Sequence, residues 1–192
     1  MPEAGDRFTF LPATANRCAD VETVFADCGD ARKCWCAFWY LPNRDFKAGW
    51  GEGNREWFER LVKSGAEPGI LAYSDKEPAA WLLIAPREKL DRLRRSRTLA
   101  PIDTAPAWAM NCFVVRKKFR RRGLMRALIR AGIGFVRERG GRVIEAYPFQ
   151  SNRKAIPGYD LFVGSAAAFQ ANGFVEVARP LPTRPIMRLQ LT

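Results

Sequence analysis

The chain has 192 residues, a formal net charge of +12 and no histidine, and 47% of its residues are hydrophobic. This length suffices for one domain with a buried core, and the charge favours anionic partners such as phosphates, nucleic acids or membrane surfaces. The lack of histidine excludes the commonest general base and zinc ligand, so proton transfer has to use Glu, Asp, Tyr, Cys or water. Five cysteines, a polar start and no apolar run of bilayer length predict a cytoplasmic protein with free thiols.

The first third of the chain predicts a strand at residues 7–11 and then a helix that Thr14 or Asn16 caps. Residues 33–40 are rich in Trp, Cys and Phe. Residues 41–53 contain several Gly and Pro and are expected to form a loop, after which Asn54 is expected to cap a second helix.

The rest of the chain alternates between strand and helix patterns. Apolar runs and turn residues predict a hairpin (69–73 and 79–84), a basic helix (87–93) and a strand–helix–strand unit (107–115, 124–139 and 143–147). An irregular loop (149–163), a short helix (165–172) and two final strands (174–178 and 186–191) are expected to follow. Ser165 is expected to cap the short helix and Gly173 to end it. This order predicts a single α/β (mixed α+β) domain over residues 1–192. In its strand–helix–strand unit, a right-handed crossover is expected to connect two parallel strands.

Residues 114–125 carry the most informative pattern. An apolar strand ends in a dense basic turn, and Gly123 then opens a long amphipathic helix. The first backbone N–H groups of such a helix are free, and its dipole favours an anion, so this layout is suited to a pyrophosphate. The alternative is a solvated basic turn at the start of an ordinary helix.

In this stretch and in the order of its elements, the chain resembles the GNAT superfamily of acyl-CoA-dependent N-acetyltransferases. The family's phosphate loop reads Arg or Gln, two residues, Gly, one residue, Gly or Ala, and the chain has Arg120 and Gly123 at the first two landmarks but Met125 at the small third one. The family pattern ends in a short helix closing on Gly-Phe, which matches Gly173 and Phe174.

The resemblance implies a GNAT-type domain with a central, mostly antiparallel mixed sheet and a parallel strand–helix–strand unit at the cofactor site. It implies acetyl-CoA as co-substrate and no metal. The cofactor contacts that it implies are Phe113, Val114, Val115, Arg120, Arg121, Arg122, Gly123, Leu124, Met125 and Phe169. Many family members carry a tyrosine as general acid at the position of Phe169, whose ring cannot donate a proton.

The candidate catalytic residues are therefore Glu145 and Tyr147, which share one face of an apolar strand. A carboxylate in such a strand is costly unless it is paired or functional, so Glu145 is either a general base or the partner of an arginine. Tyr159 or a thiol could instead supply the acid, the thiolate could leave unaided, and base action through water needs no carboxylate.

The segment Cys34-Trp35-Cys36 permits two interpretations. A zinc site would need Cys18 and Cys28 as well, but the paired Cys-x-x-Cys spacing is missing, so packed thiols are favoured. By resemblance this region walls the acceptor pocket, which makes Trp35, Trp39 and Tyr40 candidates for acceptor binding; simple core packing is the alternative.

The predicted function is transfer of an acetyl group from acetyl-CoA to a primary amine, by direct attack in a ternary complex. A covalent intermediate on Cys112 is disfavoured because no histidine could activate it. The acceptor would be a small molecule or a peptide amine, and a homodimer is possible. The rival functions are a non-catalytic acyl-CoA sensor, suggested by Phe169, and a basic nucleic-acid-binding protein, suggested by the charge.

Overall fold

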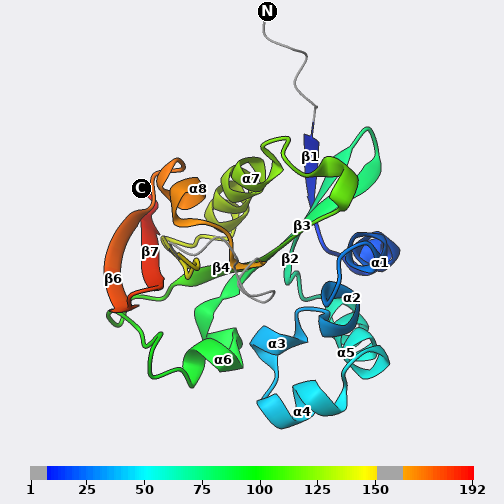
Figure 1. Ribbon diagram of the computed structural model, residues 1–192, viewed down its shortest axis with the longest axis horizontal. Helices are drawn as coiled ribbons and strands as arrows, with labels where there is room; N and C mark the ends of the chain where they lie inside the picture. The colour runs from blue at the N-terminus through cyan, green and yellow to red at the C-terminus, as the bar shows by residue number, and fades with distance from the viewer. Residues whose placement is uncertain (1–7, 151–161) are drawn as a thin grey trace, which may run out of the picture.

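The computed structural model describes residues 8–150 and 162–192. Its strands form one seven-stranded sheet in the order β1-β2-β3-β4-β5-β7-β6 (Figure 1). All neighbouring strands are antiparallel except β4 (Trp108–Val115) and β5 (Val143–Ala146), which are parallel. The predicted α/β fold, with a mostly antiparallel mixed sheet and one parallel unit, is confirmed.

Two hairpins flank the parallel pair. The turn of the first one contains Asp75 and Lys76, whose φ angles of 47° and 71° match the left-handed geometry that two-residue hairpin turns require. The strands outside the parallel pair are β1 (Phe8–Pro12), β2 (Gly69–Ser74), β3 (Glu77–Pro86), β6 (Val175–Leu181) and β7 (Arg184–Gln190).

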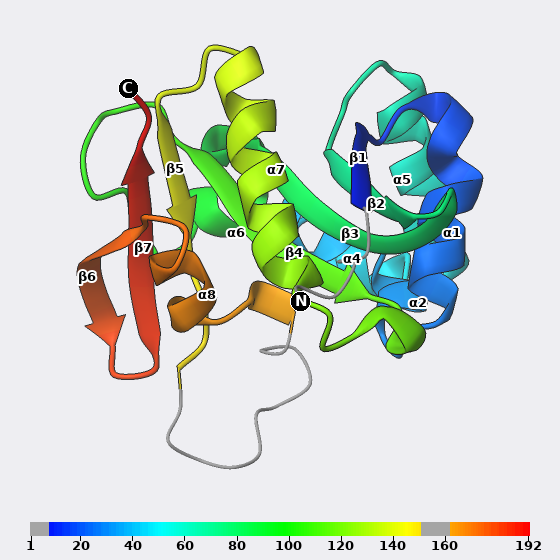
Figure 2. The ribbon, with the colours of Figure 1, turned by 90° about the horizontal axis from the view of Figure 1, so that it is seen from above.

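Helices cover both faces of the sheet, which gives two apolar layers (Figure 2). One layer lies under α7 (Leu124–Glu138) and α8 (Ala166–Gln170), and the other packs against α1, α2, α5 and α6. The remaining helices are α1 (Cys18–Ala26), α2 (Ala31–Cys34), α3 (Ala37–Tyr40), α4 (Asn43–Ala48), α5 (Glu52–Lys63) and α6 (Asp91–Arg94), with short 3₁₀ turns η1 (Ala15–Arg17), η2 (Arg87–Lys89) and η3 (Lys117–Phe119). No helix of residues 8–150 and 162–192 is long and apolar enough to cross a bilayer.

The helix α7 follows the predicted apolar pattern, since Leu124, Leu128 and Phe135 are buried. It lies close to the sheet at Gly132, where an added Cβ would come within 2.7 Å of the Met110 side chain. Packing this helix against β3 and β4 fixes the position of its N-terminus relative to the end of β4.

The expected loop at residues 41–53 and the expected cap at Asn54 are wrong. The segment contains α4, and α5 begins at Glu52, so Asn54 lies inside the helix. Its buried amide nitrogen donates to the carbonyl oxygens of Lys33 (3.1 Å) and Phe46 (3.3 Å), a tertiary role that local capping rules cannot foresee. In contrast, Ser165 caps α8 as predicted, accepting from the Ala168 N–H. Most of the expected loop at 149–163, with Tyr159, lies outside the described residues.

Candidate active site

The strands β4 and β5 pair over only three residues and then part. Their pairing ends at Met110 and Ala146, where β5 ends, while β4 continues to Val115. In the same stretch the pairing of β4 with β3 shifts register between Met110 and Phe113, which marks a β-bulge. Beyond Met110, therefore, β4 continues without pairing to β5.

The far end of β4 leads into the predicted phosphate loop. Gly123 precedes α7 in a left-handed conformation (φ 74°), and Arg121 is left-handed as well (φ 64°). The first N–H groups of α7 have no intrahelical partners, so they combine with the helix dipole to form an anion site.

A cavity of about 560 Å³, which we call the loop cavity, opens beside these N–H groups. Seven predicted cofactor residues line it: Phe113, Val115, Arg120, Arg121, Gly123, Leu124 and Met125. Arg122 and Phe169 are not among its lining residues, and Val114 borders a different pocket. The Phe169 ring is fully buried, 5.8 Å from Phe113 and 5.1 Å from Phe174, between centroids. The structure thus brings the loop residues together and places Phe169 behind them in the core.

Part of the basic run is already paired within the protein. The side chains of Arg116 and Lys118 both contact Glu77, at 2.8 and 2.6 Å. Arg120 donates from Nε to the Val115 carbonyl oxygen at 3.0 Å, which closes the turn between β4 and α7. The positive potential of the loop cavity therefore comes from Arg120, Arg121 and Arg126, which line it, and Arg120 also braces the turn.

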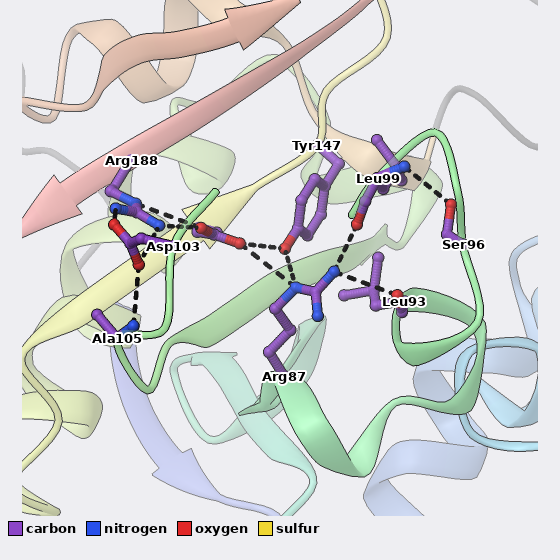
Figure 3. Close-up of polar contacts among 9 residues, drawn as sticks. Arg87, Leu93, Ser96, Leu99, Asp103, Ala105, Tyr147 and Arg188 are labelled. Carbon is purple, nitrogen blue, oxygen red and sulfur yellow. Dashed lines mark hydrogen bonds and ion pairs between the residues drawn. The ribbon is translucent and has the colours of Figure 1, made fainter. Parts of the chain in front are cut away.

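The carboxylate of Glu145 is buried. Figure 3 shows its partners Arg87, Tyr147 and Arg188 within one network of polar contacts. Its Oε1 accepts from Arg188 Nη2 at 2.6 Å, and its Oε2 accepts from the Tyr147 hydroxyl at 2.5 Å and lies 3.5 Å from Arg87 Nε. Arg188 also binds Asp103 at 2.5 Å. Two arginines thus balance two carboxylates, and the arginine-partner interpretation of Glu145 describes this geometry.

Tyr147 is held in the same network. Its hydroxyl oxygen accepts from Arg87 Nε at 3.2 Å, while its proton is donated to Glu145. Burial, followed by the negative charge of Glu145, raises the pKa of Tyr147 above its usual value near 10. The phenol therefore stays protonated at neutral pH, and its proton points to Glu145.

A second pocket, the aromatic pocket, lies beyond Cys112 and Val114 of β4 on the sheet face that carries α1 and α2. Its walls include Phe38, Trp39, Phe46 and Trp50. Of the predicted acceptor residues, only Trp39 lines it.

The other two predicted acceptor residues lie in packed surroundings. Trp35 is buried, and its ring centroid lies 5.2 Å from that of Phe25 and 5.7 Å from that of Phe58. Tyr40 packs 5.3 Å from Trp57. For both residues the geometry corresponds to the core-packing alternative.

The cysteines are packed thiols in the part of the chain that the structure describes. Cys34, Cys36 and Cys112 border the aromatic pocket, and Cys36 Sγ accepts from the Trp81 indole at 3.2 Å. Cys28 lies apart from them, 3.3 Å from the Val115 carbonyl oxygen. Among residues 8–150 and 162–192, no three Cys, Asp or Glu side chains form a metal-binding group.

Several residues of this region escaped the sequence analysis. Arg87, Arg188 and Asp103 complete the Glu145 network, and no local pattern connects them. Asn111, in the β4 bulge, is completely buried, and neither polar atom of its amide has a hydrogen-bond partner. The one available signal was a polar residue inside an apolar strand.

Comparison with known proteins decides the family. The model of the Acetyltransferase (GNAT) family matches residues 35–162. The chain belongs to the GNAT acetyltransferase family. It is thus, in its general class, an acetyl-CoA-dependent N-acetyltransferase, and the predicted family is confirmed. No curated protein matches the chain significantly.

Solved structures share the GNAT fold at low sequence identity. The PaiA N-acetyltransferase of Thermoplasma acidophilum, in complex with coenzyme A, has a TM-score of 0.53 and 10% identity, covering 96% of this chain and 99% of its own. The polyamine N-acetyltransferase of Drosophila melanogaster reaches 0.58 with 11% identity, covering 96% and 100%. The ribosomal-protein-S18-alanine N-acetyltransferase of Escherichia coli reaches 0.50 with 16% identity, covering 96% and 94%.

Proposed function

We propose that this protein transfers the acetyl group of acetyl-CoA to a primary amine by direct attack in a ternary complex. The observation that carries the proposal is the continuity between two features, the loop cavity at the start of α7 and the uncovered edge of β4 beyond Met110. Together they offer an anion site and a stretch of β4 that β5 does not pair with, which are the two surfaces that a long phosphorylated thioester needs.

In this proposal the backbone N–H groups from Arg121 to Met125, with Arg122 between them, hold the pyrophosphate. Hydrogen bonds to charged groups contribute about 1.5–3 kcal/mol each, and the helix dipole adds up to about 2 kcal/mol. The side chains of Arg121 and Arg126 add attraction from the rim of the loop cavity. Met125 lines this cavity at the position where the family pattern has a small residue.

The β4 backbone from Phe113 to Val115 would hold the pantetheine arm, and a backbone N–H near the bulge would polarise the thioester carbonyl. Acetyl-CoA supplies the activated acyl group, and the protein supplies its orientation. A donor fixed by the strand is already aligned with the developing oxyanion, which is the most effective form of such stabilisation.

Glu145 and Tyr147 act in this proposal as positioning residues. Both oxygens of Glu145 accept hydrogen bonds from the protein, and the proton of Tyr147 is given to Glu145. Their network joins β5 to Arg188 of β7 and to Arg87, which follows β3. In this proposal the amine has to arrive neutral or lose its proton to water. Phe169 stands where many family members have a tyrosine, so no phenol at that position protonates the leaving thiolate.

The proposed acceptor is a primary amine of a small molecule or a peptide. The family neighbours named above include enzymes for a polyamine and for an alanine of ribosomal protein S18. We place the enzyme in the cytoplasm because all five cysteines are free thiols, which suits a reducing compartment.

Charge reversal at matched positions of α7 tests the proposed cofactor site. Arg126, which lines the loop cavity, and Arg137, near the far end of the helix, are both exposed, so R126E and R137E change the net charge equally. In calorimetric titrations, R126E should weaken acetyl-CoA binding by about tenfold or more, the equivalent of one lost charged contact. R137E should bind like the wild type. Equal effects of the two substitutions would refute this site, and acetyl-CoA binding without thiol release with any amine would favour the sensor.

A further inference from the structure

The aromatic pocket beside β4 is too small to hold the body of an acceptor. Its volume of about 60 Å³ corresponds to about two water molecules, which leaves room for little more than an acetyl group and the attacking nitrogen. A larger cavity of about 260 Å³, which we call the basic cavity, adjoins it. The two spaces share the side chains of Phe38, Trp39 and Val163. An amine that extends past these side chains from the basic cavity arrives at the floor of the aromatic pocket, which β4 supplies.

The basic cavity offers positive charge and hydroxyl groups to a ligand. Its lining comes from α6 and the loop after it, from the residue after β5 and from the β6–β7 hairpin. Ser96 Oγ accepts from the Leu99 N–H at 2.9 Å, which leaves the hydroxyl proton for a ligand (Figure 3). None of the described residues that line the cavity is acidic, and the polar ones are Arg92, Ser96, Thr98, Tyr147 and Arg184.

The guanidinium group of Arg92 is held in place while one of its amino groups stays unused. Its Nε donates to the Phe38 carbonyl oxygen at 2.8 Å, and its Nη2 donates to Asn43 Oδ1 at 3.1 Å. The guanidinium carbon lies 3.9 Å from the Phe38 ring centroid. Within residues 8–150 and 162–192, Nη1 forms no hydrogen bond. A guanidinium fixed in this way can bind a carboxylate with little further loss of side-chain freedom.

The charge of Arg92 is not balanced by an ion pair with another described residue. The adjacent carboxylate, Asp91, is bound instead by Arg94 at 2.6 Å and by Arg95 at 2.8 Å. Burial lowers the pKa of Arg92, because it removes part of the guanidinium from water. A brace between α6 and α3 needs only the hydrogen bonds, whereas a partly buried cation without a carboxylate partner is expected where an anion binds.

From this geometry we propose that the acceptor amine also carries a carboxylate, which binds Arg92 in the basic cavity. This inference rests on the proposed function and narrows its substrate class. The neutral nitrogen attacks the carbonyl carbon of the thioester, the C–N bond forms and the C–S bond breaks. The proton lost from nitrogen passes through water to the leaving sulfur. A diamine bound in the same way would instead place its second ammonium group against Arg92.

The first test compares acceptors that differ only in the group meant for the basic cavity. The wild-type protein is given acetyl-CoA with ω-amino carboxylates of three to six carbons or with leucine, and each is compared with its primary amide. Rates are referred to the fraction of neutral amine, so that different amine pKa values cancel. The best carboxylate should have a kcat/KM about 10- to 100-fold above that of its amide, the range for one hydrogen bond between charged groups. The corresponding diamine should be the poorest acceptor.

Substitution of Arg92 assigns this preference to the basic cavity. Arg92→Gln should lower kcat/KM for the carboxylate about 10- to 100-fold, mainly through KM, and leave the value for the amide unchanged. Arg92→Lys keeps the charge without the planar fork and should retain part of the preference. Arg97→Gln removes an equal charge at an exposed site outside the cavity and should behave like the wild type. If Arg92 only braced α6, its loss would lower the values for carboxylate and amide alike.

Cofactor binding separates this inference from the proposed function. Calorimetry should show the same acetyl-CoA affinity for Arg92→Gln and for the wild type. Equal use of carboxylates and amides, a preference for the diamine, or a preference that survives in Arg92→Gln would overturn the inference while leaving acetyl transfer intact. Acetyl-CoA binding without acetylation of any of these carboxylates would also overturn it. Failure of the wild type to bind acetyl-CoA would instead remove the proposed function.

Discussion

The Tyr147 hydroxyl donates to Glu145 Oε2 at 2.5 Å, inside a network that also contains the buried arginines Arg87 and Arg188. The pair sits where β5 ends and parts from β4. Tyr147 and Glu145, the two candidates for acid and base, are thus hydrogen-bonded to each other. The proposed reaction therefore relies on orientation and on the medium around the amine.

Tyr147 should make the stability of the protein sensitive to alkaline pH. Its pKa is raised in the folded state, mainly by burial, so the unfolded chain loses this proton first as pH rises above about 10. The stabilising effect is complete below pH 10 and is lost above it. Urea unfolding between pH 9 and 11 should show a steeper fall for the wild type than for Tyr147→Phe, by up to about 1.4 kcal/mol per pH unit. Identical slopes would contradict the buried, protonated phenol.

Glu145→Gln should destabilise the fold strongly because it leaves Arg188 and Arg87 with an uncompensated buried charge. Breaking a buried ion pair typically costs about 3–5 kcal/mol. Glu138→Gln, at an exposed site on α7, should change the free energy of unfolding by less than about 0.5 kcal/mol. If Glu145 only positions other groups, the folded fraction of Glu145→Gln should show the same inflections in its pH profile of kcat/KM as the wild type. Loss of that inflection would identify Glu145 as the general base.

Two buried asparagines should respond in opposite ways to the same substitution. Asn111 has no hydrogen-bond partner for its amide, whereas the Asn54 amide nitrogen donates to two carbonyl oxygens. Asn111→Val removes an unsatisfied polar group and should raise the free energy of unfolding by about 1 kcal/mol. Asn54→Val removes both hydrogen bonds, although the Lys33 carbonyl oxygen still accepts from the Gly51 N–H, and should lower it by about 1–3 kcal/mol. Thermal or urea unfolding measures both, and a loss of stability in Asn111→Val would mean that its amide is satisfied in solution.

Arg121 holds a left-handed backbone conformation that disfavours side chains with a Cβ (φ 64°). Arg121→Gly and Arg121→Ala remove the same charge, but only glycine relieves this strain, which is worth about 1–2 kcal/mol. The glycine variant should therefore be the more stable of the two by about 1 kcal/mol. Both should lose acetyl-CoA affinity to the same extent. Equal stabilities would show that the loop relaxes in solution.

The sequence was most informative where structure and chemistry are local. The strand, the basic turn and the helix from Val114 to Arg139 could be predicted because periodicity and the position of Gly123 specify them together. The partners of Glu145 could not, since Arg188 and Arg87 come from other strands and turns and meet it only through sheet order. Trp39 was proposed from the sequence as an acceptor residue and lines the aromatic pocket, which stays a prediction about its role. Phe46 and Trp50 belong to a segment whose glycines and prolines concealed α4.

The central claim is that the start of α7 holds the pyrophosphate and that the uncovered edge of β4 holds the thioester arm. A crystal structure with coenzyme A tests it most directly. The account predicts pyrophosphate oxygens within hydrogen-bond distance of the N–H groups between Arg121 and Met125, and the sulfur between β4 and β5 near Cys112. Coenzyme A bound elsewhere, or a loop cavity closed to it by Met125, would contradict the account.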